Sequence, residues 1–182
     1  KYDYCPNYTG ALYESIYYPN GNLDSIDRYT INLGNSLQSK VYHFFPHNRN
    51  GKVFIYHSGH IYGRANNWDS FQTEDQYMNN LGLLSGEVIP RLIAEGYEVI
   101  CFMMPLYGNN RPIINIPNIG DVEFDYHNQI FYYLPQPYTY FFNPIVRVLN
   151  YVQKVYGHSS FNMIGLAGGG WTTTLYAAID QR

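Results

Sequence analysis

A chain of 182 residues is long enough to build one domain with a substantial core. Hydrophobic residues make up 46% of it and charged residues only 14%, which excludes an intrinsically disordered chain. The formal net charge is -3 and the 11 Lys and Arg residues are scattered, so no nucleic-acid partner is expected. No stretch approaches the roughly 18 to 20 consecutive apolar residues of a membrane span, and none is expected.

The first part of the chain is expected to combine an irregular leader with three strands. Residues 1–28 are rich in Tyr, Asn, Pro and Gly and lack a sustained period, which predicts an irregular N-terminal leader. Strands are predicted over 28–33 and 39–45, joined by a turn that begins at Gly34. The short, nearly continuous apolar run over 52–58 is typical of a central strand covered on both faces.

A helix and a buried strand are predicted next. The helix spans 85–96, with Ser85 as its cap and Gly96 as its C-terminal stop. The apolar run over 97–104 follows at once and reads as a second central strand.

The last part repeats this order with clearer signals. Asn143 is the expected cap of a helix, Pro144 its first residue and Gly157 its end. A strand over 160–166 and a further helix follow it. The whole pattern indicates an α/β fold, with a mostly parallel sheet and helices on both faces, in one domain over 29–182.

The segment 107–142 does not fit this alternation. It holds four prolines and six tyrosines and far exceeds the ~12 to 15 residues of an ordinary unstructured loop. We expect a long aromatic loop that either forms a lid over a pocket or covers its own core with tyrosine.

Three segments carry a resemblance to a known family. "FIYHSGH" (54–60) resembles the third strand and oxyanion loop of the α/β-hydrolase superfamily, particularly its dienelactone-hydrolase-like and esterase-like members. "LIAEGYEVICFMMPLYGNN" (92–110) is similar to the first helix and fourth strand, and "MIGLAGGGWTTTLYAAID" (163–180) to a nucleophile elbow with its helix. The resemblance covers 28–182 and implies the N-terminal part of that fold.

The elbow departs from its G-x-S-x-G pattern because Ala167 stands at the position of the nucleophilic serine. The resemblance implies that the amide of Gly168, with an amide from Gly59 or His60, forms the oxyanion hole. The alternative is a helix-entry turn that is rich in glycine for packing only.

Four further residues are candidates for the pocket: His57, Ser58, Tyr107 and His127. For His127 the simpler interpretation is that it lies in an exposed loop and contacts no pocket. His57 and His60 have the spacing H-x-x-H but no third ligand nearby, so no metal is expected.

The resemblance implies an ester hydrolase of the serine type that works through an acyl-enzyme without a cofactor. Its substrate would be a small-molecule or carbohydrate ester. Ala167 cannot form that intermediate, so the chain itself is expected to be an inactive, nucleophile-less form. In the family the catalytic acid and histidine follow the nucleophile, which places both beyond Arg182. A C-terminal remainder of the same polypeptide is therefore an expected partner.

Two other functions stay open. A non-catalytic binding or structural protein can keep this fold as a scaffold. The spacing Gly165-x-Ala167-x-x-Gly170 also approximates a dinucleotide-binding fingerprint, although that motif opens the first strand–helix unit of its fold and here it follows several strands.

Composition also predicts where the protein works. The 21 tyrosines, with few charged residues, favour a secreted or periplasmic protein. Cys101 lies in an apolar strand and is expected to be a core residue, and a disulfide with Cys5 is left open.

Overall fold

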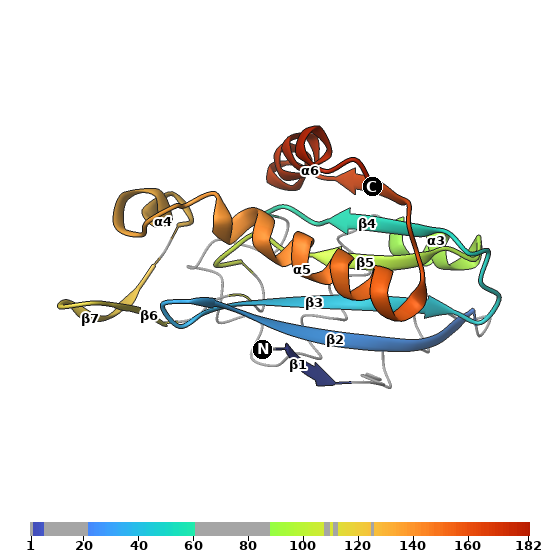
Figure 1. Ribbon diagram of the computed structural model, residues 1–182, viewed down its shortest axis with the longest axis horizontal. Coiled ribbons are helices and arrows are strands. Elements are labelled where there is room, and N and C mark those ends of the chain that lie inside the picture. The colour runs from blue at the N-terminus through green and yellow to red at the C-terminus, as the bar shows by residue number, and fades with distance from the viewer. Residues whose placement is uncertain (1, 6–21, 61–87, 108–109, 111–112, 125) are drawn as a thin grey trace.

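The central strands follow the apolar runs of the sequence and lie side by side in one sheet (Figure 1). The structure is a computed structural model that describes residues 2–5, 22–60, 88–107, 110, 113–124 and 126–182. Within these residues, six strands form a sheet with the order β1-β2-β3-β5-β4-β8. Their bounds are Tyr2–Cys5 for β1, Leu23–Gly34 for β2, Leu37–Pro46 for β3, Val53–His57 for β4, Glu98–Phe102 for β5 and Phe161–Gly165 for β8.

Strand direction divides the sheet into two parts. β1, β2 and β3 form antiparallel pairs, and β3 is also antiparallel to β5. β4 lies between β5 and β8 and runs parallel to both, because helices connect these strands. The mixed sheet confirms the expected α/β class. The turn between β2 and β3 has positive φ at Asn35 and Ser36 (50° and 62°), which suits a two-residue hairpin after Gly34.

One face of the sheet is covered by α3 (Val88–Ala94). Side chains alternate between the faces along a strand, so Val99 and Cys101 of β5 share the face on which α3 packs Ile89 and Ile93. Burial raises the pKa of the Cys101 thiol above its ordinary range, and this cysteine is free and buried, as a core residue should be.

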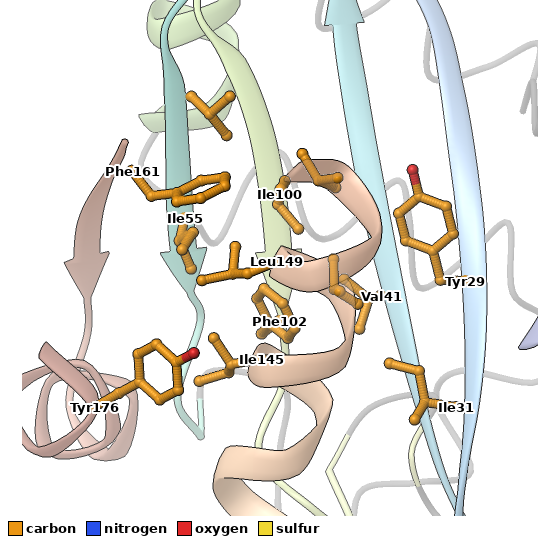
Figure 2. Close-up of a cluster of buried hydrophobic side chains, with 13 residues drawn as sticks. Tyr29, Ile31, Val41, Ile55, Ile100, Phe102, Ile145, Leu149, Phe161 and Tyr176 are labelled. Atoms are coloured by element: carbon orange, nitrogen blue, oxygen red, sulfur yellow. The ribbon is translucent and has the colours of Figure 1, made fainter. Parts of the chain in front are cut away.

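The other face is covered by α5 (Thr139–Tyr156) and α6 (Gly168–Ile179). Ile100 and Phe102 of β5 point to this face and belong to its core. Figure 2 shows the core side chains meeting between α5, α6 and the strands; the labelled ones are Tyr29, Ile31, Val41, Ile55, Ile100, Phe102, Ile145, Leu149, Phe161 and Tyr176. Each large apolar side chain buried in this way stabilises the fold by about 1.5–3 kcal/mol. Helices on both faces are thus confirmed.

The irregular leader predicted over 1–28 is wrong where the structure describes it. Tyr2–Cys5 forms β1, and β2 begins at Leu23. β1 escaped detection because an edge strand pairs through its backbone and needs no apolar pattern. A register shift between Leu23 and Ser25 interrupts the alternation at the start of β2. The rest of the expected leader, 6–21, lies outside the described residues.

The long loop predicted over 107–142 is also wrong. The segment forms β6 (Ile113–Ile116), β7 (Gly120–Glu123), α4 (Asn128–Tyr133) and the start of α5. Apolar side chains of this segment pack with Leu37, Met104 and Leu106 into a separate hydrophobic core. The residues that the segment contributes include Ile114, Phe124, Ile130, Leu134, Tyr140 and Phe141. Elements this short show too few repeats of a period to be recognised in the sequence.

The predicted start of α5 needs the same correction. The helix begins at Thr139, and Pro144 lies inside it rather than at its first position. Asn143 does not cap the helix; its Oδ1 accepts a hydrogen bond from Nε of Arg147 (2.9 Å). The predicted end is confirmed, because Gly157 has the left-handed φ of 80° that favours glycine. Ser85, the predicted cap of the preceding helix, lies outside the described residues.

In the described part of the chain, no helix is long and apolar enough to cross a membrane.

Candidate active site

The turn between β8 and α6 has a strained backbone. Ala167 adopts φ 50° and ψ -119°, a conformation that alanine rarely takes, and α6 begins at the next residue. Two backbone hydrogen bonds hold the turn: the amide of Leu166 donates to the carbonyl oxygen of His57 (3.0 Å), and that of Gly169 to the carbonyl oxygen of Leu166 (2.8 Å). A nucleophile elbow is also a sharp, strained strand-to-helix turn, and the turn around Ala167 is called the elbow below.

Glycine is required here by the close approach of two backbone segments. A Cβ atom on Gly169 would lie 2.2 Å from the carbonyl oxygen of His57, and one on Gly59 would lie 2.1 Å from the carbonyl oxygen of Leu166. Gly59 also has a positive φ of 65°. The segment after β4 therefore lies directly against the elbow, at the edge where the parallel strands β4 and β8 end.

The segment 57–60 keeps the name oxyanion loop from the family resemblance, and it is anchored to β5. The amide and hydroxyl of Ser58 both donate to the carbonyl oxygen of Phe102, at 2.9 and 3.1 Å. The amide of Gly59 approaches Nδ1 of His57 at 3.4 Å. His57 and Ser58 are almost fully buried. They position the loop and do not line the cavity described below, which corrects the expectation that both belong to the pocket.

The imidazole of His60 lies over the start of α6. A Cβ atom on Gly168 would meet Cε1 of His60 at 2.3 Å and its Nδ1 at 2.7 Å. Nε2 of His60 lies 3.2 Å from Nδ1 of His127, and the two rings stack with centroids 4.8 Å apart. The ring of Tyr107 packs edge-on against His60, at 4.7 Å between centroids. Four residues singled out in the sequence thus meet beside the elbow.

A cavity of about 180 Å³ opens at this place. Tyr107 packs against His60 and is not among the described residues that line this cavity. Sequence reasoning missed most of the wall, because it comes from α4, α5, α6 and the residues after β5, and no local pattern joins these segments. The lining residues are His60, Met104, His127, Phe131, Phe141, Gly168 and Trp171.

The histidines at the site are neutral at neutral pH. Burial lowers the pKa of His57 to about 3, with a further contribution from the charge of His60. Burial also lowers the pKa of His127 to about 4, again with His60 adding to the shift, and lowers the pKa of His60. Within the described residues, no group of three or more His, Cys, Asp and Glu is placed to hold a metal ion.

Solved structures of esterases have a similar fold. A proposed acetyl xylan esterase from Bacteroides fragilis matches with a TM-score of 0.63 and 13% identity, over 99% of this chain and 45% of its own. An acetyl xylan esterase from Paenibacillus sp. R4 matches with a TM-score of 0.56 and 15% identity, over 100% and 51%. A cold-adapted esterase from an Arctic intertidal metagenomic library matches with a TM-score of 0.52 and 11% identity, over 89% and 61%.

The comparisons identify the fold and show how much of each esterase structure this chain covers. No family model and no curated protein matches the sequence. The chain spans about half the length of the two acetyl xylan esterase structures. At these identities the likeness concerns the fold alone: the chain has the α/β-hydrolase-type architecture of these esterases.

Proposed function

We propose that this domain belongs to an ester hydrolase of the serine type, present here in a form with alanine at the nucleophile position. The observation that carries the proposal is the backbone of Ala167, held at φ 50° and ψ -119° between β8 and the start of α6. Backbone strain of about 1–3 kcal/mol persists only where the surroundings enforce it, and it clusters at functional sites. Here the oxyanion loop enforces it.

The chemistry would be acyl transfer. A serine hydroxyl at position 167 would lose its proton to a base and attack the ester carbonyl carbon. The amide of Gly168, with that of Gly59 or His60, would donate to the oxyanion of the tetrahedral intermediate. That intermediate would release the alcohol and leave an acyl-enzyme, which water would hydrolyse. We propose that the base and its acidic partner come from a part of the polypeptide that follows Arg182.

The walls of the cavity support an uncharged ester as substrate. The aromatic side chains and Met104 supply apolar surface, and the two histidines that line the cavity are neutral. A small-molecule or carbohydrate ester would find apolar contacts here and no fixed charge.

An exposed apolar stripe on α6 supports a covering segment. Trp171, Leu175 and Ile179 are spaced four residues apart, so they share one side of the helix, and their exposed fractions are 39%, 38% and 67%. The edge strand β8 lies beside this helix. We propose that a C-terminal remainder of the same polypeptide adds to β8 and covers the stripe.

The first test measures the oxyanion hole without any base. In Ala167→Cys, the thiol would lie at the start of α6 and face the proposed amide donors. These favour the thiolate, so its pKa should fall below the ordinary value of about 8.5. Leu166→Cys is the control, because Leu166 precedes the elbow and is exposed. The measurement is the rate of iodoacetamide alkylation against pH; equal thiol pKa values in the two variants would contradict the oxyanion hole.

The second test restores the nucleophile. In the full-length polypeptide, Ala167→Ser should hydrolyse small activated esters and react with a serine-directed phosphonate at residue 167. Removing the serine of a hydrolase triad costs on the order of 10⁶ in turnover, so the gain should be large. A folded Ala167→Ser protein with neither activity nor labelling would favour the alternative, a binding protein on a hydrolase scaffold. Ala167 itself supports that alternative, since the chain as it stands can bind an ester but cannot form an acyl-enzyme.

A further inference from the structure

The histidine pair in the cavity joins two segments that are far apart in the sequence. His60 belongs to the oxyanion loop, and His127 lies 67 residues later, just before α4 (Asn128–Tyr133). His127 is held from three sides: it stacks on His60, lies 5.6 Å from the ring of Tyr107, and meets Phe141 edge-on at 5.7 Å. A ring fixed in this way directs its Nδ1 atom to a constant position.

The hydrogen bond between the two rings requires a defined proton arrangement. Two neutral imidazoles carry one N–H each, so one ring must donate and the other accept. If Nε2 of His60 donates to Nδ1 of His127, then Nδ1 of His60 is unprotonated. This nitrogen faces Gly168 at the start of α6, where the helix dipole favours a lone pair over an N–H. The local field favours the tautomer in which His60 donates, and the hydrogen bond to His127 fixes it.

The selected tautomer leaves one hydrogen-bond acceptor at the cavity. Nδ1 of His60 has no hydrogen-bond partner among the described residues, and both His60 and Gly168 line the cavity. The other lining side chains, His127 apart, are apolar or aromatic. Among the described lining side chains, an O–H group that enters this cavity would therefore meet one oriented acceptor at Nδ1 of His60.

We propose that His127 is a positioning residue that fixes His60 in one orientation and one tautomer, so that Nδ1 of His60 accepts a hydrogen bond from a hydroxyl group of the bound ester. The proposal rests on the proposed function, because it assumes that an ester occupies the cavity beside the elbow. It adds a requirement on the substrate: the ester carries a free hydroxyl within reach of His60.

The first experiment observes the tautomer directly. Long-range ¹H–¹⁵N NMR of the 182-residue chain should show His60 with a protonated Nε2 and a bare Nδ1. His127→Phe keeps a ring against Tyr107 and Phe141 but removes the hydrogen bond, so His60 should become a mixture of tautomers. His127→Asn places a polar atom where Nδ1 was and should restore the single tautomer. His47→Phe, in an exposed turn, is the control and should change nothing.

The second experiment tests the ligand. Because Ala167 cannot form an acyl-enzyme, esters remain intact, and their binding can be followed by the shifts of the cavity resonances. Glycerol 1-acetate, which carries free hydroxyls, should bind roughly fivefold more tightly than ethyl acetate, the factor expected for one neutral hydrogen bond. His127→Phe should remove this preference and His127→Asn should retain it.

Each result decides between the two proposals. A protonated Nδ1 on His60, or a tautomer unchanged in His127→Phe, overturns the positioning role. Equal affinities for the two esters, or no binding of either, overturn the hydroxyl requirement. The thiol pKa of Ala167→Cys depends on the backbone amides at the elbow and not on His127, so an ordinary thiol pKa with an intact histidine pair would mark failure of the proposed hydrolase function instead.

Discussion

Ala167 is the residue at which local preference and tertiary structure disagree most. Alanine disfavours φ 50° and ψ -119°, and glycine tolerates such angles because it has no Cβ. The surrounding contacts hold the residue there: the amide of Leu166 is bonded to His57, and the carbonyl oxygen of Ala167 accepts from the amide of Trp171 (3.2 Å). An alanine kept under strain is what a replaced nucleophile would leave behind.

Ala167→Gly should therefore stabilise the chain. Relief of the strained backbone outweighs the greater flexibility of glycine in the unfolded chain, and the free energy of unfolding should rise by about 1 kcal/mol. Ala178→Gly, within α6, is the matched control and should lower stability by roughly 0.5–1 kcal/mol. Urea unfolding of the three proteins provides the measurement. If Ala167→Gly and Ala178→Gly lower the free energy of unfolding by similar amounts, residue 167 is not strained.

At the scale of elements, the site depends on how closely α6 approaches the oxyanion loop. The carbonyl oxygen of His57 occupies the place that a Cβ on Gly169 would need, at 2.2 Å. Around the neighbouring Gly170 the nearest atom, the carbonyl oxygen of Gly165, would be 3.3 Å from such a Cβ. The two adjacent glycines of α6 thus face very different surroundings.

This difference predicts opposite outcomes for two conservative substitutions. Gly169→Ala should force α6 away from the loop and lower the free energy of unfolding by about 1–3 kcal/mol, as overpacking does. Gly170→Ala meets a contact that a small shift can relieve, and alanine favours the helix, so its effect should stay below about 1 kcal/mol. Chemical denaturation compares the two variants directly. An equal loss in both would mean that the elbow and the loop are not in close contact.

At the scale of the whole molecule, buried histidines should make the fold sensitive to acid. His57 binds a proton near pH 6.5 when the chain is unfolded, but only near pH 3 when it is folded. Its contribution to stability is present above pH 6.5 and is lost as the pH falls toward its folded pKa. The free energy of unfolding should then drop by up to about 1.4 kcal/mol per pH unit for this group. His127 acts in the same direction between pH 6.5 and about 4.

His57→Gln tests this dependence because glutamine keeps a polar side chain but does not titrate. Urea unfolding between pH 7 and pH 4.5 should give a slope smaller by about one bound proton than that of the wild-type chain. The absolute stability of the variant does not matter for this comparison. Parallel curves for the two proteins would show that His57 is not buried in its neutral form.

The apolar stripe on α6 provides a test of the proposed C-terminal remainder of the polypeptide. In the 182-residue chain, Ile179→Lys should change stability by less than about 0.5 kcal/mol and reduce the binding of a hydrophobic dye, because the side chain is exposed. In the full-length polypeptide the same change should be destabilising. Val155→Lys, at an exposed apolar position of α5, is the control and should be tolerated in both. Tolerance of Ile179→Lys in the full-length polypeptide would contradict a covering segment.

Amino-acid order alone determined the framework of this protein. Apolar runs over a few residues located β4 and β5 because buried strands of a parallel sheet carry side chains on two covered faces. Gly157 marked the end of α5, and the glycines around Ala167 marked the elbow, because these positions demand particular backbone conformations or close contacts. Such signals are local, so the sequence contains them in readable form.

Tertiary structure decided the rest, for a physical reason that differs from case to case. β1 pairs through backbone atoms, and α4 is too short to show a period, so neither leaves a sequence pattern. The proline in α5 became an interior residue because the packed helix outweighs its local preference. The cavity wall and the contact between His60 and His127 join segments tens of residues apart, and only chain packing brings them together. Local sequence determined the strands and the strained turn; packing at a distance determined what surrounds that turn.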